Sequence, residues 1–155
     1  MITIRSRVRK YPVDTKKMAQ DVLIVLNDLK YADFDLGIFL TTNKIIQQYN
    51  RDFRHKDQPT DILAFPYHHN VRPGKRIVVT QEEDKNLGDL VISLEYVSKK
   101  GQEYGYTFDY YLKKLLIHGI CHLLGYDHIK DTDYQRMAKE EERLLHKIAE
   151  APEHF

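Results

Sequence analysis

Three histidines in the second half of the chain have the residue type and the spacing of a metal site: His118, His122 and His128. His118 and His122 are four positions apart, so on a helix both imidazoles leave the same face, with Cβ atoms about 5–6 Å apart. Gly125 can end that helix, because glycine enters the left-handed conformation without steric cost, and the chain can then bring His128 towards the pair. Three imidazoles can bind Zn²⁺ and leave its fourth coordination position open. The spacing therefore predicts a zinc site on a helix and the loop that follows it.

The same spacing is found in the metzincin proteases, which follow the pattern H-E-x-x-H-x-x-G-x-x-H. This chain has Gly119 where those proteases have the glutamate that acts as general base. A peptide hydrolase needs that carboxylate to accept a proton from water, so the departure disfavours a protease. The alternative for the histidines is hydrogen-bonded packing, in a chain that contains 8 of them. Cys121 is rotated off the histidine face and is predicted to be a small core residue rather than a fourth ligand.

Length and composition predict one globular domain that spans residues 1–155. The chain is 42% hydrophobic and 30% charged, which is typical of globular proteins and not of disordered ones. It has neither an apolar run near the roughly 18 residues of a membrane span nor a signal-peptide pattern, so we expect no membrane association. A single cysteine cannot form an internal disulfide, which favours the reducing cytoplasm. The net charge of +1 neither indicates nor excludes a nucleic-acid partner.

Basic residues gather near the N-terminus. Arg5, Arg7 and Arg9 alternate along the chain, so on a strand they would share one face. Such a stripe could follow a phosphate backbone, or it could be a solvated edge strand that its charges keep from aggregating. These three arginines are therefore candidate substrate contacts, with the edge strand as the alternative.

Hydrophobic periodicity predicts alternating strands and helices. Strands are expected at residues 2–8, 34–40, 62–65 and 87–93, and helices at residues 15–29, at a short segment after Thr42, and at residues 94–104, 108–123 and 132–149. Residues 67–86 are expected to form an excursion with a small hairpin at residues 76–80. These elements predict an α+β fold: one mixed four-stranded sheet packed with about five to six helices, mostly on one face.

The expected helix starts have recognisable capping residues. Thr42, Ser93 and Thr107 are predicted N-caps, and Thr132 with Gln135 has the spacing of a capping box for the last helix. Several residues of that helix are expected to face the core: Tyr134, Met137, Ala138, Leu144, Leu145 and Ile148.

Three stretches resemble the YbeY family of bacterial metal-dependent endoribonucleases, which mature ribosomal RNA. They are residues 50–54 together with 59–66 (NRDFR and PTDILAFP), residues 87–93 (LGDLVIS) and residues 118–128 (HGICHLLGYDH). The last stretch is the most specific, and the similarity runs in register over about residues 40–146. At Cys121 the family usually has an aliphatic residue.

The resemblance implies an α+β fold in which His118, His122 and His128 bind one zinc ion beside a basic cleft. It implies that Arg54 is the cleft arginine needed for activity and that His118 belongs to the catalytic site. It also implies a role in 3′-end maturation of small-subunit (16S) ribosomal RNA and in ribosome quality control. The partners would be single-stranded RNA, the small subunit and ribosome assembly factors, and we expect a cytoplasmic monomer.

The residue types suit phosphodiester cleavage. Zn²⁺ can polarise phosphate oxygens and lower the pKa of water to about 7, so a carboxylate at position 119 is not needed. Arg54 can hold a phosphate by two parallel hydrogen bonds, or it could form a surface ion pair with Asp52 or Asp57.

Further residues near the histidines have two interpretations each. Asp61, Asp89 and Asp127 could orient an imidazole through a hydrogen bond, or they could be turn and cap residues. A tyrosine cluster could stack on unpaired bases or pack in the core: Tyr96, Tyr104, Tyr106, Tyr110 and Tyr111.

Three classes of function follow. The leading class is a zinc-dependent endoribonuclease specific for single strands. The second is a zinc-stabilised ribosome-binding factor with little catalysis, and the third is a peptidase, which Gly119 disfavours. Cleavage of RNA that a chelator abolishes would support the first class against the other two.

Overall fold

A four-stranded mixed sheet organises the computed structural model, which describes residues 1–127 and 130–149. Its strands are β1 (Ile2–Ser6), β2 (Asp35–Thr41), β3 (Ile62–Pro66) and β4 (Asn86–Ser93), in the order β1-β2-β4-β3. β1, β2 and β4 are parallel, and β3 runs antiparallel to β4 along the second edge. The mixed four-stranded sheet predicted from the sequence is therefore confirmed.

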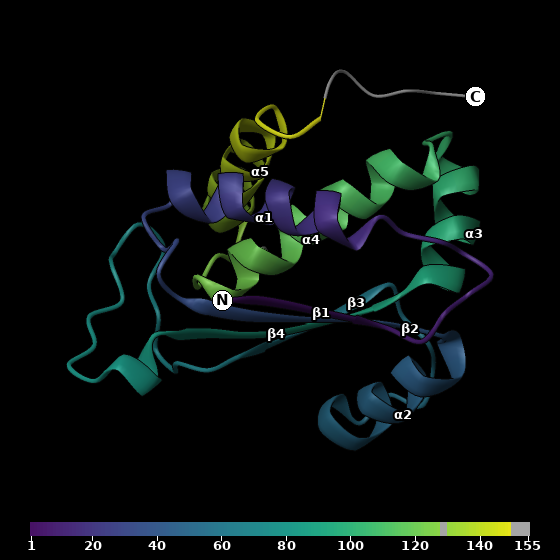
Figure 1. Ribbon diagram of the computed structural model, residues 1–155, viewed down its shortest axis with the longest axis horizontal. Helices are drawn as coiled ribbons and strands as arrows, with labels where there is room; N and C mark the ends of the chain where they lie inside the picture. Colours follow the sequence, from purple (N-terminus) through teal and green to yellow (C-terminus); the bar gives the residue numbers. More distant parts are fainter. Residues whose placement is uncertain (128–129, 150–155) are drawn as a thin grey trace.

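Helices cover the two faces of this sheet unequally (Figure 1). One face carries α1 (Thr15–Asp28), α3 (Leu94–Tyr104), α4 (Phe108–Leu123) and α5 (Asp131–Leu145), and the other carries α2 (Asn43–Arg54). The described ranges contain these five α-helices and one short 3₁₀ turn at Glu82–Asp84, which lies between β3 and β4. None of these helices combines the length and the apolarity needed to cross a membrane. The single α+β domain agrees with the prediction.

The predicted N-caps of three helices are confirmed. The side-chain oxygen of Thr42 accepts a hydrogen bond from the Ile45 backbone N–H at 3.5 Å. Ser93 and Thr107 do the same for the backbone N–H groups of Tyr96, at 3.3 Å, and Tyr110, at 3.2 Å. Each cap satisfies an N–H group that has no partner inside its own helix. The start of α4, and with it the position of the histidines along the helix, is therefore set locally.

Some expectations about element ends are wrong. β1 ends at Ser6, two residues before its expected end, and the Ser6 hydroxyl accepts a hydrogen bond from the Val8 N–H at 3.3 Å. The expected hairpin at residues 76–80 has no strand in the described part of that segment. The only regular element that the structure describes between β3 and β4 is the 3₁₀ turn at Glu82–Asp84.

The last helix also departs from its prediction. α5 begins at Asp131 and has no side-chain cap, so Thr132 lies within the helix and the proposed capping box is wrong. Acidic residues in the first turn stabilise this end through the helix dipole instead. Tyr134 is 60% exposed and Ala138 is exposed, whereas the core expectation holds for Met137.

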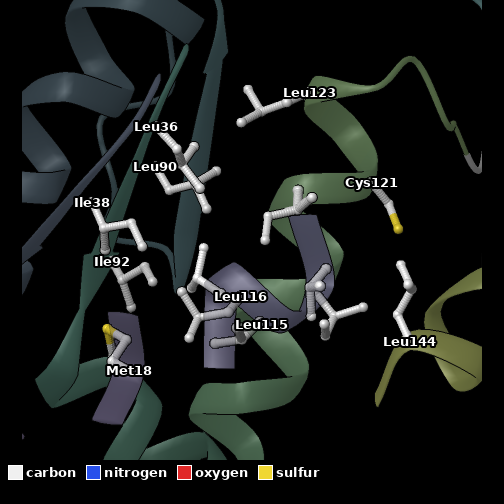
Figure 2. Packing of buried hydrophobic residues seen from close by; sticks show 14 of the residues in the cluster. Met18, Leu36, Ile38, Leu90, Ile92, Leu115, Leu116, Cys121, Leu123 and Leu144 are labelled. Carbon is white, nitrogen blue, oxygen red and sulfur yellow. The ribbon is translucent and has the colours of Figure 1, made fainter. Parts of the chain in front are cut away.

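The main core lies between the sheet and α4 (Figure 2). Apolar residues of β2 and β4 face apolar residues of α4 there: Leu36, Ile38, Leu90, Ile92, Leu115 and Leu116. α1, α3 and α5 pack on the remaining sides of α4, so this helix is the central one of its layer. A helix held on several sides gives the imidazoles it carries fixed positions.

Gly119 allows α4 to approach the sheet closely. A Cβ atom at this position would lie 2.7 Å from both Ile62 Cδ1 and Leu90 Cδ2. The residue that replaces the protease glutamate is therefore directed into the packed interface with β3 and β4. A larger side chain would have to displace the ends of the Ile62 and Leu90 side chains, which disfavours a carboxylate at position 119.

Replacing Gly119 with alanine is therefore expected to destabilise the fold. The overpacking should cost about 1–3 kcal/mol, and the better helix propensity of alanine should return up to about 1 kcal/mol. Chemical denaturation measures the difference. Gly101→Ala is the matched control, since a Cβ at that position in α3 would lie 3.5 Å or more from its nearest neighbours. Equal stability changes in the two variants would contradict the close approach.

Candidate metal centre

Two histidine side chains converge on the exposed side of α4. His118 Nε2 and His122 Nε2 are 3.1 Å apart, and the two ring centroids are 4.5 Å apart with the planes at 88°. Both side chains are half-buried. The structure thus brings together the first two predicted ligands by the helical spacing that the sequence indicates.

The Nδ1 atom of each imidazole ring has a hydrogen-bond acceptor beside it, which fixes the orientation of the ring. His118 Nδ1 donates to Glu141 Oε1 at 3.2 Å, and His122 Nδ1 donates to the Tyr126 carbonyl at 3.1 Å. A carboxylate and a carbonyl can only accept, so the Nδ1 atoms carry the protons and, in neutral imidazoles, both Nε2 atoms present lone pairs. Lone pairs at this distance repel each other unless a positive charge stabilises them.

This donor arrangement fits a metal ion. A tetrahedral zinc with Zn–N bonds of about 2.0–2.1 Å would hold two ligating nitrogens about 3.3 Å apart, close to the observed separation. Hydrogen bonds from Nδ1 to a carboxylate or carbonyl are the usual way to orient metal-binding histidines. Among the described residues no group of three candidate ligands is present. The third predicted ligand, His128, lies outside the described residues, so the three-histidine set stays a prediction.

The end of α4 follows the predicted glycine turn. Gly125 has φ +89°, and the Gly125 and Tyr126 N–H groups donate to the carbonyls of His122 and Cys121, each at 3.1 Å. A Cβ at Gly125 would lie 2.3 Å from the Val71 carbonyl oxygen. Glycine is required at this position both by the backbone conformation and by the closeness of the neighbouring chain. The turn also places the Tyr126 carbonyl against His122.

Glu141 is a partner of His118 that the sequence argument missed. It lies on α5, 23 residues from His118, and its side chain is 17% exposed. A signal for it was available, because Glu141 is four positions after the buried Met137 and three before the buried Leu144. An acidic residue on the apolar stripe of a helix has to find a partner in the interior.

Three aspartates were predicted as candidates to orient an imidazole. Asp61 accepts hydrogen bonds from Tyr111 Oη at 3.2 Å and from the Ile62 N–H at 2.7 Å. Asp89 lies over Gly37 on the face of the sheet opposite to α4, so the prediction that it orients an imidazole is wrong. Strand alternation explains this, because the neighbouring Leu90 is the residue that faces α4. For Asp127 this role stays a prediction.

A pocket of about 440 Å³ opens beside His118. Residues of α3, α4, α5 and the start of β3 line it: Asp61, Tyr104, Tyr106, Tyr111, Lys114, Leu115, His118 and Glu141. Burial, reinforced by the Asp61 carboxylate, raises the pKa of the Tyr111 hydroxyl. The hydroxyl therefore stays protonated and donates to Asp61. The pocket gives a ligand access to the imidazole of His118.

Arg54 lies at the last turn of α2, next to the edge strand β3. Its Nη2 donates to the Ala64 carbonyl at 2.8 Å, and its guanidinium carbon is 5.8 Å from the centre of the Phe65 ring. The alternative ion pairs are not formed, since Asp52 pairs with Arg51 and Asp57 accepts from Gln47. Arg54 is exposed and is not among the described residues that line the His118 pocket.

The N-terminal arginines lie away from the histidines. Arg5 and Arg7 line a groove of about 1120 Å³ on the face of the sheet that carries α2, together with Tyr49 and Phe53 of that helix. Arg5 and Arg7 thus share a side as predicted, although Arg9 is not among the described residues that line the groove. β1 is also an edge strand, as the alternative interpretation requires.

Cys121 is a core residue, as predicted. It is fully buried, and Figure 2 shows its side chain directed towards Leu144 of α5. Burial raises the pKa of its thiol, so the thiolate form that binds metals is disfavoured.

An α+β domain with converging imidazoles beside an open pocket has the features of a metal-dependent hydrolase. A family model described as "Endoribonuclease YbeY" matches residues 2–149. The chain belongs to the YbeY family, a family of metal-dependent endoribonucleases that hydrolyse RNA phosphodiester bonds. The resemblance drawn from the sequence is confirmed.

Individual relatives agree with the family model. The chain is 33% identical to the endoribonuclease YbeY of Homo sapiens over 147 residues, which cover 95% of this chain and 87% of that protein. It is 37% identical to the endoribonuclease YbeY of Carboxydothermus hydrogenoformans over 128 residues, which cover 83% and 81%. The solution structure of TM1509 from Thermotoga maritima has the same fold, with a TM-score of 0.64, 24% identity and coverage of 96% and 89%.

Proposed function

We propose that this chain is a zinc-dependent endoribonuclease that cleaves single-stranded RNA, with His118, His122 and His128 as the zinc ligands. The observation that carries the zinc part is the convergence of two Nε2 atoms at 3.1 Å while their Nδ1 atoms donate to Glu141 and Tyr126. Family membership supports RNA as the substrate.

The protein's own residues would act mainly by position. His118 and His122 hold the ion, and the acceptors at their Nδ1 atoms keep the rings in the tautomer that binds metal. A bound Zn²⁺ supplies Lewis acidity towards phosphate oxygens and lowers the pKa of water. Arg54 has guanidinium N–H groups beyond the one donated to Ala64, and these can hold a phosphate of the strand.

The proposed biological role is 3′-end maturation of 16S ribosomal RNA and ribosome quality control in the cytoplasm, with the small subunit and its assembly factors as partners. Membership of the YbeY family supports this role. Arg5 and Arg7 would contact RNA or the ribosome on the α2 face of the sheet, away from the histidines.

A second candidate is a zinc-stabilised ribosome-binding factor with little catalysis. The large groove with Arg5 and Arg7 favours it, because a binding surface there does not need the His118 pocket. A peptidase is disfavoured, since Gly119 supplies no general base and a carboxylate at this position would have to displace Ile62 and Leu90.

The test incubates metal-loaded protein with single-stranded RNA, duplex RNA and casein, each with and without a chelator. Cleavage of the single strand alone, lost with the chelator and restored by added Zn²⁺, is the expected result. Co-sedimentation with small subunits and no cleavage would favour the binding factor. Casein hydrolysis, or RNA cleavage that resists the chelator after the metal is shown to be gone, would refute the proposal.

Glu141→Gln is expected to weaken zinc binding about 10- to 100-fold. The amide can still accept from His118 Nδ1, but it lacks the negative charge that makes the imidazole a better ligand. Competition with a fluorescent zinc chelator measures the affinity. Glu142→Gln is the control, because the Glu142 side chain is 77% exposed on the same helix. Equal affinities in the two variants would remove Glu141 from the metal centre.

A further inference from the structure

One wall of the His118 pocket is an exposed aromatic ring. Tyr104 is the last residue of α3, it is 55% exposed, and it lines the same pocket as His118. Its ring makes T-shaped contacts with Tyr111, with centroids 5.7 Å apart, and with Tyr106, with centroids 6.3 Å apart, and the Lys100 ammonium lies 5.9 Å from its centre. The buried Tyr111 supports the ring from the core. Tyr104 is therefore an exposed but supported platform.

Two consecutive lysines of α4, Lys113 and Lys114, differ in their ion pairs. Lys113 forms ion pairs with Asp109 at 3.2 Å and with Asp21 at 3.9 Å. Lys114 has no ion pair within 4.0 Å in the described part of the chain and lines the pocket instead. It is one helical turn before His118, so the ammonium and the imidazole share a face of the helix.

The acidic groups of the pocket already have partners. Asp61 accepts from Tyr111 and from the Ile62 N–H, and Glu141 accepts from His118. A ligand in the pocket would therefore meet the Tyr104 ring and the Lys114 ammonium. A π-face with a cation suits a nucleobase followed by a phosphate, because every base can stack on an aromatic ring. The volume of about 440 Å³ is in the range of small-molecule sites.

We propose that this pocket is a subsite for one unpaired nucleotide next to the bond that is cleaved. Its base stacks on Tyr104, and its phosphate contacts Lys114. The inference rests on the proposed ribonuclease function and adds a cause for selection of single strands. In a duplex the faces of a base are covered by its neighbours, so the base cannot stack on Tyr104.

The experiment compares Tyr104→Leu and Tyr104→Phe with Tyr134→Leu, a control for a tyrosine that is 60% exposed on α5. The substrates are single-stranded oligoribonucleotides with 2-aminopurine at successive positions. For Tyr104→Leu we expect KM to rise about tenfold and the quenching of 2-aminopurine at one position to be lost. Tyr104→Phe should keep both. Lys114→Gln should also raise KM, whereas Lys139→Gln on α5 should not.

The outcomes separate the two proposals. If the unchanged protein shows no chelator-sensitive cleavage of RNA, the proposed function fails. If the unchanged protein cleaves RNA but Tyr104→Leu matches Tyr134→Leu in KM and quenching, the nucleotide subsite alone is refuted. Thermal unfolding and zinc content of every variant are measured first. An unchanged Tm and zinc stoichiometry with a raised KM supports stacking, because a purely structural role would alter stability.

Discussion

Replacing His118 with alanine is expected to remove stoichiometric zinc and RNA cleavage together. The variant keeps His122 but loses the Nε2 atom 3.1 Å from it, and two remaining imidazoles cannot complete a three-histidine site. Cleavage should fall by more than about 100-fold, since changes that merely disturb the partners of a ligand already cost about 10- to 100-fold. Zinc content by mass spectrometry and cleavage of single-stranded RNA are the two measurements.

The control for this variant is His146→Ala. The His146 side chain is 76% exposed at the end of α5, so its loss should change neither zinc content nor cleavage. The fold of His118→Ala should persist, because the core on the sheet side of α4 does not include this residue. One zinc ion per chain in the His118→Ala protein would contradict the ligand assignment.

The histidine pair could be predicted because everything that sets it is local. The Thr107 cap, the apolar stripe of α4, the spacing of His118 and His122, and Gly125 act within about five turns of one helix. The same holds for the caps at Thr42 and Ser93. Local hydrogen bonds and helical geometry are encoded within a few residues, so a single sequence is enough to read them.

The partners of the histidines could not be predicted in the same way. Glu141 reaches His118 only because α5 packs across α4. The relative position of two packed helices could not be predicted from this sequence. The order of the strands depends on long-range pairing, so the sequence alone did not determine it. The capping-box prediction failed for a different reason. Thr132 and Gln135 have the spacing of a capping box, but the helix starts at Asp131, so Thr132 lies inside it.

Arg54→Ala is expected to keep the fold and the zinc but to lower kcat/KM for single-stranded RNA by about 10²–10³-fold, the cost of removing one well-placed donor to a developing anion. The fold should persist because Arg54 is exposed and its hydrogen bond to Ala64 contributes only about 0.5–1.5 kcal/mol. Arg54→Lys should recover little, since an ammonium cannot form two parallel hydrogen bonds to phosphate.

Arg51→Ala is the matched control on the same helix, because the Arg51 side chain forms an ion pair with Asp52. Cleavage by Arg54→Ala at the rate of the unchanged protein would remove Arg54 from the mechanism. In that case its contacts with Ala64 and Phe65 at the edge of β3 would be its structural role.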